Sequence, residues 1–244
     1  MKYELKMPIN PTDRDNGGQL KMSALLYFAQ EAAGAHAETL GAGWDALQEK
    51  GLFWAVIRTR VEILAQPTGN EVILKTWPMP TSRTAYPRCV MGYDQDGTLL
   101  FKLVSLWVLM DIKTRAMVLP GKSGVEVLGT LYGDEPEQPR GLPVNDQEQV
   151  VYKTVEQCHL DVNGHMNNTR YMDWVMELAE NRPVQKLELC YFNEGILGDQ
   201  MEIGFTKNND AIQVAIHHQR TDGTDKKDRV FAAQVQYSVN QSEK

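Results

Sequence analysis

The sequence runs through the same order of elements twice, and this repeat is what most restricts its fold. In the first copy, apolar residues recur every three or four positions from Met22 to Leu40, which predicts a helix that ends at Gly41 and Gly43. A short helical stretch follows at 44–50. Apolar and polar residues then alternate, which predicts successive strands at 52–66, 70–78, 85–94, 98–112 and 115–120.

The second copy repeats this order. A strand at 148–158 precedes a helix with Tyr171, Trp174, Val175 and Leu178 on one stripe, which ends near Pro183. Further strands are predicted at 185–193, 200–207, 211–220 and 229–239. A helix followed by a twisted antiparallel sheet that can wrap it predicts an α+β fold in each half. We expect a first domain at 1–125, a linker rich in Pro, Gly and acidic residues at 126–147, and a second domain at 148–244.

Composition excludes several classes of protein. The chain has 244 residues, 42% of them hydrophobic, enough for one large core or two smaller ones. A net charge of -7 gives no electrostatic footprint for nucleic acid. No apolar run approaches the roughly 18 residues of a membrane span, and the start of the chain lacks a signal-peptide pattern, so we expect a soluble, cytoplasmic protein. Cys89, Cys158 and Cys190 have no metal-site spacing and are expected to be reduced thiols.

One segment, 159–174, carries an unusual density of polar side chains directly before the second long helix. The two copies can be aligned on Asp15 with Asp161 and Gly18 with Gly164, and further along on Gly69 with Gly198. The alignment separates shared residues from unshared ones. Three residues of the second copy are not kept in the first: Asn163, His165 and Glu194 stand where the first copy has Gly17, Gln19 and Ala65. This asymmetry predicts a single chemical site, in the second half.

The segments "DVNGHMNNTRYMDWVMEL" and "LELCYFNE" resemble the acyl-acyl carrier protein thioesterases, a tandem hot-dog family, and the likeness extends over essentially the whole chain. The resemblance implies two hot-dog units, with an acyl-chain pocket in the first and catalysis in the second. The family's Asp-x-Asn-x-His and Tyr-x-x-Glu motifs fall on Asp161, Asn163, His165 and Glu194 as catalytic residues. Gly195 stands where some plant members carry a cysteine, which excludes a thiol nucleophile there.

These residue types fit thioester hydrolysis. Asn163 is expected at the N-cap of the helix, with Gly164 and His165 in the first turn, so that fixed backbone N–H groups could stabilise a developing oxyanion. Asp161 is expected either to attack the carbonyl or to act as base for a water, oriented by Asn163. His165 would polarise the carbonyl or protonate the departing thiolate, and Glu194 would activate or position the water.

Other interpretations remain open from the residues alone. Asn163 could serve only as a cap, and Asp161 with His165 could be half of a metal site, for which only Glu194 and His159 offer further ligands. We favour the metal-free site and predict no cofactor. Alternative functions are an acyl-CoA thioesterase, a hot-dog dehydratase and a non-catalytic acyl-binding protein.

The implied partner is acyl carrier protein bearing an acyl thioester. That protein is acidic, so this acidic chain would need a local basic patch to bind it. A homodimer is left open, because a tandem hot dog already contains the pairing that single hot dogs achieve by dimerising. The candidate basic residues are Arg58, Arg60, Arg83 and Arg88 in the first half and Arg220, Lys226, Lys227 and Arg229 in the second.

Overall fold

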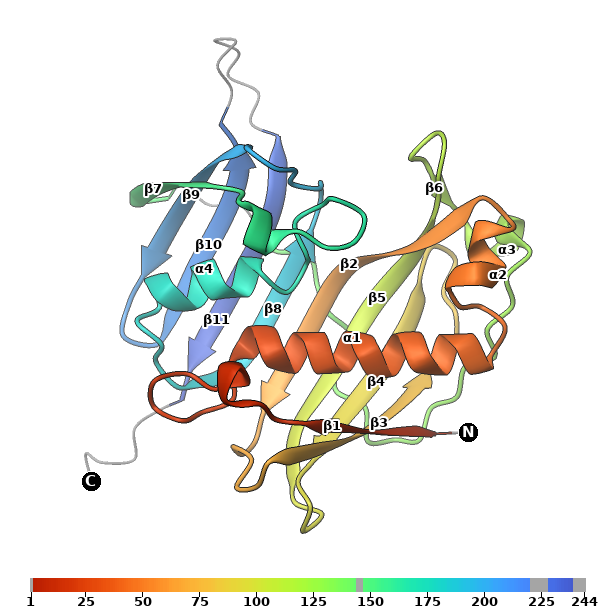
Figure 1. Ribbon diagram of the computed structural model, residues 1–244, viewed down its shortest axis with the longest axis horizontal. Helices are drawn as coiled ribbons and strands as arrows, with labels where there is room; N and C mark the ends of the chain where they lie inside the picture. The colour runs from red at the N-terminus through yellow and green to blue at the C-terminus, as the bar shows by residue number, and fades with distance from the viewer. Residues whose placement is uncertain (1, 144–146, 220–227, 239–244) are drawn as a thin grey trace. The chain divides into compact units, whose positions relative to one another are not determined.

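The computed structural model describes residues 2–143, 147–219 and 228–238. The chain divides into two compact units, Met1–Pro139 and Arg140–Lys244. Each unit contains one antiparallel sheet and one main helix, so the α+β architecture expected for each half is confirmed (Figure 1). No helix in the described part of the chain has both the length and the apolar character needed to span a bilayer.

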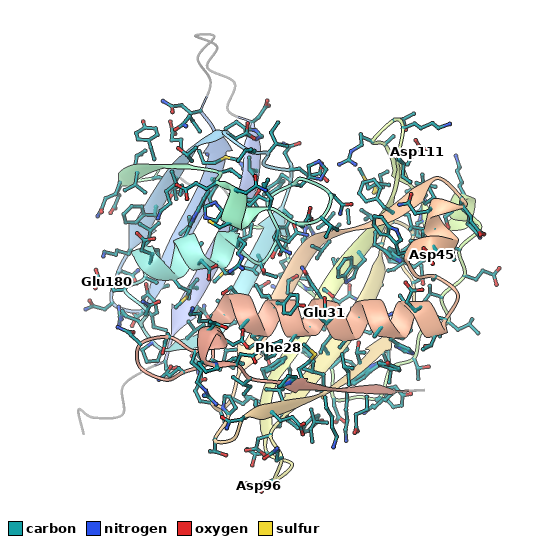
Figure 2. All side chains as sticks on the ribbon, viewed as in Figure 1. Phe28, Glu31, Asp45, Asp96, Asp111 and Glu180 are labelled. Carbon is teal, nitrogen blue, oxygen red and sulfur yellow. The ribbon has the colours of Figure 1, made fainter. Side chains whose placement is uncertain are left out.

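The first unit is built around helix α1 (Met22–Thr39), which packs on strands β1, β3 and β4 (Figure 1). Both leucines and most alanines of α1 are buried, and Ala32 is fully buried. Figure 2 labels Phe28, which is buried, and Glu31 on the exposed side of the same helix.

The sheet order of the first unit is β1-β3-β4-β5-β2, with β6 paired to β5. The strands are β1 (Tyr3–Pro8), β2 (Leu52–Ile63), β3 (Glu71–Pro78), β4 (Tyr86–Tyr93), β5 (Leu99–Asp111) and β6 (Met117–Val118); the short helices are η1 (Pro11–Asp13), α2 (Trp44–Gln48) and α3 (Pro120–Ser123).

The second unit has the same plan with a shorter main helix, α4 (Tyr171–Leu178). The Tyr171 ring stacks on Phe231 of β11 at 5.0 Å between centroids, so α4 packs on its own sheet as α1 does. The sheet order is β8-β11-β10-β9-β7. Its strands are β7 (Gln149–Thr154), β8 (Val184–Tyr191), β9 (Gln200–Lys207), β10 (Ala211–His218) and β11 (Arg229–Tyr237), and the short helix η2 spans Gln157–His159.

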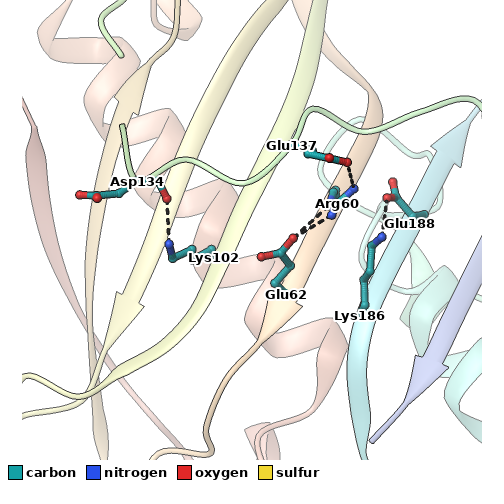
Figure 3. A network of polar contacts seen from close by, with 7 residues as sticks. All are labelled: Arg60, Glu62, Lys102, Asp134, Glu137, Lys186 and Glu188. Atoms are coloured by element: carbon teal, nitrogen blue, oxygen red, sulfur yellow. Dashed lines mark hydrogen bonds and ion pairs between the residues drawn. The ribbon is translucent and has the colours of Figure 1, made fainter. Parts of the chain in front are cut away.

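Much of the stretch expected to be a linker contacts the first unit. The Thr130 N–H donates to the Pro78 carbonyl at 2.9 Å, and the Trp77 indole Nε1 donates to Glu135 at 3.0 Å. Figure 3 shows Arg60 of β2 held by carboxylates of Glu62 and Glu137, at 2.9 and 3.0 Å. Residues 126–139 therefore pack on the first unit and do not form a free linker.

Gly92 on β4 permits a close approach that any side chain would prevent. Its register partner on β5 is Phe101, which is 1% exposed, and a Cβ on Gly92 would collide with the Phe101 ring. We expect Gly92→Ala to lower the free energy of unfolding by about 1 to 3 kcal/mol in urea titrations, the usual cost of overpacking. Gly34→Ala is the matched control, because Gly34 is exposed in α1 with open space around it. It should stabilise by about 0.5 to 1 kcal/mol. Equal effects of the two would contradict this account.

Candidate functional site

The polar segment before α4 folds into a tight turn organised by Asp161. Its Oδ1 accepts hydrogen bonds from the N–H groups of Asn163, at 2.8 Å, and His165, at 3.3 Å. The Gly164 N–H donates to the Asp161 carbonyl at 3.1 Å, and Gly164 has a φ of 77°, which favours glycine. A β-bridge between Leu160 and Met166 closes the turn. The backbone of the segment is thus fixed before the helix begins.

The first unit contains the same turn around Asp15. Asp15 Oδ1 accepts from the N–H groups of Gly17 and Gln19, both at 2.9 Å, and Gly18 has a φ of 78°. A bridge between Arg14 and Leu20 closes it. The structure therefore confirms the alignment of the two halves at this anchor, and it shows that the turn itself is architectural. Only the side chains that the turn displays differ between the units.

The expectation that Asn163 caps the helix is wrong. The helix α4 begins at Tyr171, and Asn163, Gly164 and His165 precede it in the turn. Their N–H groups donate to Asp161, so they are not free to bind an oxyanion at a helix N-terminus. The reason is that Asp-x-Asn-Gly is as good a turn sequence as a capping sequence. These three N–H groups therefore do not form the oxyanion site that was expected at a helix cap.

The structure brings His165 and Glu194 together. His165 Nε2 lies 3.5 Å from Glu194 Oε2, and their side chains are 29% and 45% exposed. A β-bridge joins His165 to Ile196, and the Met166 N–H donates to the Gly195 carbonyl at 2.7 Å. These backbone contacts hold the Glu194 segment beside the turn. Residues 29 apart in sequence thus form an imidazole–carboxylate pair open to solvent.

The Glu194 segment is anchored at its other end by residues that sequence analysis missed. Asp199 Oδ2 accepts the Ile196 N–H at 2.9 Å and lies 3.2 Å from His218 Nε2 on β10. The sequence offered no signal for this contact, because it depends on the pairing of β9 with β10. Gly195 is buried, and a Cβ there would lie 3.1 Å from the Tyr171 hydroxyl. A cysteine at this position would not fit without rearrangement.

Asp161 and Asn163 lie at the surface of the turn. Asp161 is half-buried and Asn163 is exposed, and the intervening Val162 is 99% exposed. His159 lies apart, because its Nδ1 accepts the Glu156 N–H at 2.9 Å. No cluster of three or more His, Cys, Asp or Glu side chains suited to a metal ion is found within residues 2–143, 147–219 and 228–238.

The first unit contains an apolar pocket of about 220 Å³ between α1, α2 and the sheet. Trp44, Trp54 and Trp107 are among its lining residues, and the charged residues that line it are Glu38 and Arg88. The Glu38 carboxylate accepts the Trp44 N–H at 2.7 Å at the start of α2. Arg88 is buried in β4, where burial lowers its pKa to about 10, so it remains protonated at neutral pH.

Several candidates for a basic docking patch are not on the surface. Arg60 and Arg88 are each only 8% exposed, and Arg60 is already paired with carboxylates, so neither can form part of a docking surface. Arg83 is exposed and Arg58 is half-buried. Arg229 is half-buried with its guanidinium over the Phe192 ring. The remaining candidates, Arg220, Lys226 and Lys227, lie outside the described residues.

The family model for the acyl-ACP thioesterase N-terminal domain matches residues 1–119, and the model for the C-terminal domain matches residues 144–238. The chain belongs to the acyl-ACP thioesterase family. A solved acyl-ACP thioesterase from Bacteroides thetaiotaomicron superposes with a TM-score of 0.84 at 23% identity, covering 97% of this chain and 98% of that one. The 12:0-ACP thioesterase from Umbellularia californica gives a TM-score of 0.76 at 20% identity, covering 96% of each. These likenesses confirm the tandem hot-dog fold.

Relatives of the acyl-ACP thioesterase family are also found among plant proteins. The palmitoyl-acyl carrier protein thioesterase of Arabidopsis thaliana is 29% identical over 194 residues, which are 71% of this chain and 47% of that protein. The dodecanoyl-[acyl-carrier-protein] hydrolase of Umbellularia californica is 28% identical over 192 residues, which are 70% of this chain and 50% of that protein. The chain thus spans about half the length of these named relatives, both described as chloroplastic.

Proposed function

We propose that this protein hydrolyses fatty acyl-acyl carrier protein thioesters and releases free fatty acids, which ends chain elongation. Family membership gives the reaction class. The single observation that carries the proposal within this chain is the pairing of His165 with Glu194 at 3.5 Å on a turn whose counterpart in the first unit has Gln19 and lacks the acid. A turn needed only for architecture would not require that pair.

The proposed chemistry assigns one task to each side chain. Asp161, fixed by two N–H groups, supplies the carboxylate that either attacks the thioester carbonyl or takes a proton from water. Asn163 is exposed beside it and donates from its carboxamide to the carbonyl oxygen, where one such donor is worth about 3 to 4 kcal/mol. As the carbon–sulfur bond breaks, His165 protonates the thiolate. Glu194 orients His165 and the hydrolytic water.

Attack by Asp161 and general-base catalysis by Asp161 can be distinguished by which product contains the oxygen atom from water. One turnover in heavy-oxygen water labels only the released fatty acid if water attacks the thioester directly. Label in the Asp161 carboxylate, read by mass spectrometry of the peptide, would identify an anhydride between the acyl group and Asp161.

We assign the two roles to different units. The apolar pocket of the first unit would hold an acyl chain, because alkyl groups favour an apolar cavity. Its lining lies in the predicted first domain, 1–125, except for Val127. The second domain, 148–244, would carry the catalytic side chains, with 126–147 between them. We further propose acyl carrier protein as the partner, a cytoplasmic location and a possible homodimeric state as features to be tested.

The test is thiol release from purified protein with acyl carrier protein and coenzyme A thioesters of varied chain length. We expect release, with faster turnover of the carrier-protein thioesters. Faster release from coenzyme A thioesters would favour the acyl-CoA thioesterase alternative. Hydration of an enoyl thioester without thiol release would indicate a dehydratase. Binding without turnover would indicate an acyl-binding protein, and it would contradict the proposed function.

A further inference from the structure

Asp199 and His218 form a polar clamp at the end of the segment that carries Glu194. One oxygen, Asp199 Oδ2, accepts the Ile196 N–H at 2.9 Å and lies 3.2 Å from His218 Nε2 of β10. The Asp199 N–H donates in return to the Ile196 carbonyl at 3.1 Å. The two clamp side chains are 26% and 27% exposed, so solvent and salt screen their interaction less than that of a fully exposed pair. The clamp therefore holds Ile196 through both its N–H and its carbonyl, two residues after Glu194.

Ile196 is also the residue through which this segment meets the turn. A β-bridge pairs it with His165, whose Nε2 lies 3.5 Å from Glu194 Oε2. Both side chains of that pair are open to solvent, so packing alone does not fix the Glu194 carboxylate. Its place beside His165 depends on the backbone that the clamp holds. A displacement of a catalytic group by about 1 Å can cost about a hundredfold in rate.

The first unit fastens the corresponding segment without such a clamp. Asn70, next to the aligned Gly69, stands where the second unit has Asp199. The carbonyls of Asn70 and Asp199 accept equivalent backbone N–H groups, at 2.8 and 2.9 Å. The Asn70 side chain is exposed, and the Arg14 guanidinium donates to the Gly69 carbonyl at 2.6 Å. The shared architecture thus does not require a carboxylate at this position, and the carboxylate occurs in the unit that carries Glu194.

We propose that Asp199 and His218 are positioning residues for Glu194. They hold its segment against the turn, so that its carboxylate meets His165. Asp199 supplies the oxygen that fixes the Ile196 N–H, and His218 holds the Asp199 carboxylate in place. This inference rests on the proposed function, in which Glu194 orients His165 and the hydrolytic water. Neither clamp side chain is assigned a contact with the substrate.

Steady-state kinetics with an acyl-acyl carrier protein thioester tests the clamp. Asp199→Ala should lower kcat about 10- to 100-fold and leave KM within about twofold, because a displaced Glu194 affects the reaction step more than binding. Asp199→Asn keeps an oxygen that can accept the Ile196 N–H, so its kcat should recover to within about fivefold of wild type. Asn70→Ala, at the equivalent exposed position of the first unit, is the matched control and should leave kcat unchanged. Equal losses in Asp199→Ala and Asn70→Ala would overturn the proposal.

A double-variant cycle distinguishes positioning of Glu194 from a general loss of structure. In a Glu194→Gln background, Asp199→Ala should lower kcat by no more than about threefold, because the carboxylate that it positions is already gone. His218→Ala should lower kcat about three- to tenfold in the wild type and by no more than about twofold in that background. Losses as large in the Glu194→Gln background as in the wild type would contradict the proposal. If Asp199→Ala does not fold by circular dichroism, the cycle with His218→Ala decides.

Imidazole NMR of protein labelled at the histidine nitrogens tests the clamp without turnover. Glu194→Gln removes the negative charge beside His165 Nε2, so the His165 imidazole resonances should shift. Asp199→Ala displaces the same carboxylate and should shift them in the same direction, whereas Asn70→Ala should not. If the protein releases no thiol but His165 responds in this way, the proposed function fails and the clamp stands. If it releases thiol but Asp199→Ala changes neither kcat nor the His165 resonances, the clamp fails and the function stands.

Discussion

His165→Ala should lower kcat for an acyl-acyl carrier protein thioester by about 10²- to 10⁴-fold, the usual contribution of a positioned acid or base. The backbone of His165 forms the turn, and its side chain is 29% exposed, so the free energy of unfolding should stay within about 0.5 kcal/mol of wild type. Gln19→Ala is the matched control, because Gln19 occupies the same place in the turn of the first unit. It should leave kcat unchanged.

The pairing of His165 with Glu194 also predicts how the effects of substitutions at the two residues combine. If the two side chains act as a unit, Glu194→Gln combined with His165→Ala should cost little more than His165→Ala alone. Losses that multiply in the double variant would contradict a shared role. Steady-state kinetics of the wild type, both single variants and the double variant measures this directly.

Asp161→Asn should lower kcat by a similar factor, about 10²- to 10⁴-fold, without unfolding the turn. Asparagine keeps an Oδ1 that can accept the N–H groups of Asn163 and His165 but has no negative charge. Asp161→Ala removes both properties, so it should also lower the free energy of unfolding by about 0.5 to 1.5 kcal/mol per lost hydrogen bond. Kinetics and urea unfolding on both variants separate the chemical role of Asp161 from its structural one.

Asp15 provides the control that this comparison requires. Asp15→Ala removes the equivalent turn bonds in the first unit and should lower stability in the same way. Asp15→Asn should change neither kcat nor the free energy of unfolding. If Asp161→Asn retained activity within about threefold, the carboxylate would have no part in the reaction, and Asp161 would be architectural like Asp15.

Periodicity predicted most of the fold because both signals were strong. Apolar residues three and four apart predicted a helix from Met22 to Leu40, and α1 spans Met22–Thr39. Alternation predicted a strand at 98–112, and β5 spans Leu99–Asp111. No element was predicted at Tyr3–Pro8, which forms β1. The strand pattern was nevertheless present, because Tyr3, Leu5 and Met7 alternate with Glu4 and Lys6, and it was overlooked. In the structure β1 pairs with β3.

The sequence predicted which residues belong to the candidate site but not how the chain positions them. The comparison of the two halves singled out Asn163, His165 and Glu194, and two of these meet in the structure. The start of α4 was misplaced because turns and helix caps use the same residues. Neither the anchoring of Asp199 by His218 nor the burial of Arg88 follows from local sequence, since both depend on strand pairing. The catalytic roles stay predictions until the variants are measured.

The same turn occurs twice in this chain, with the same backbone hydrogen bonds but different side chains. Asp15 and Asp161 hold nearly the same hydrogen bonds, whatever side chains the turn displays. The turn can therefore display Gly17 and Gln19 in one copy and Asn163 and His165 in the other without losing its backbone hydrogen bonds. The side chains at these displayed positions are therefore decoupled from the stability of the turn, and a substitution there changes the chemistry without changing the backbone.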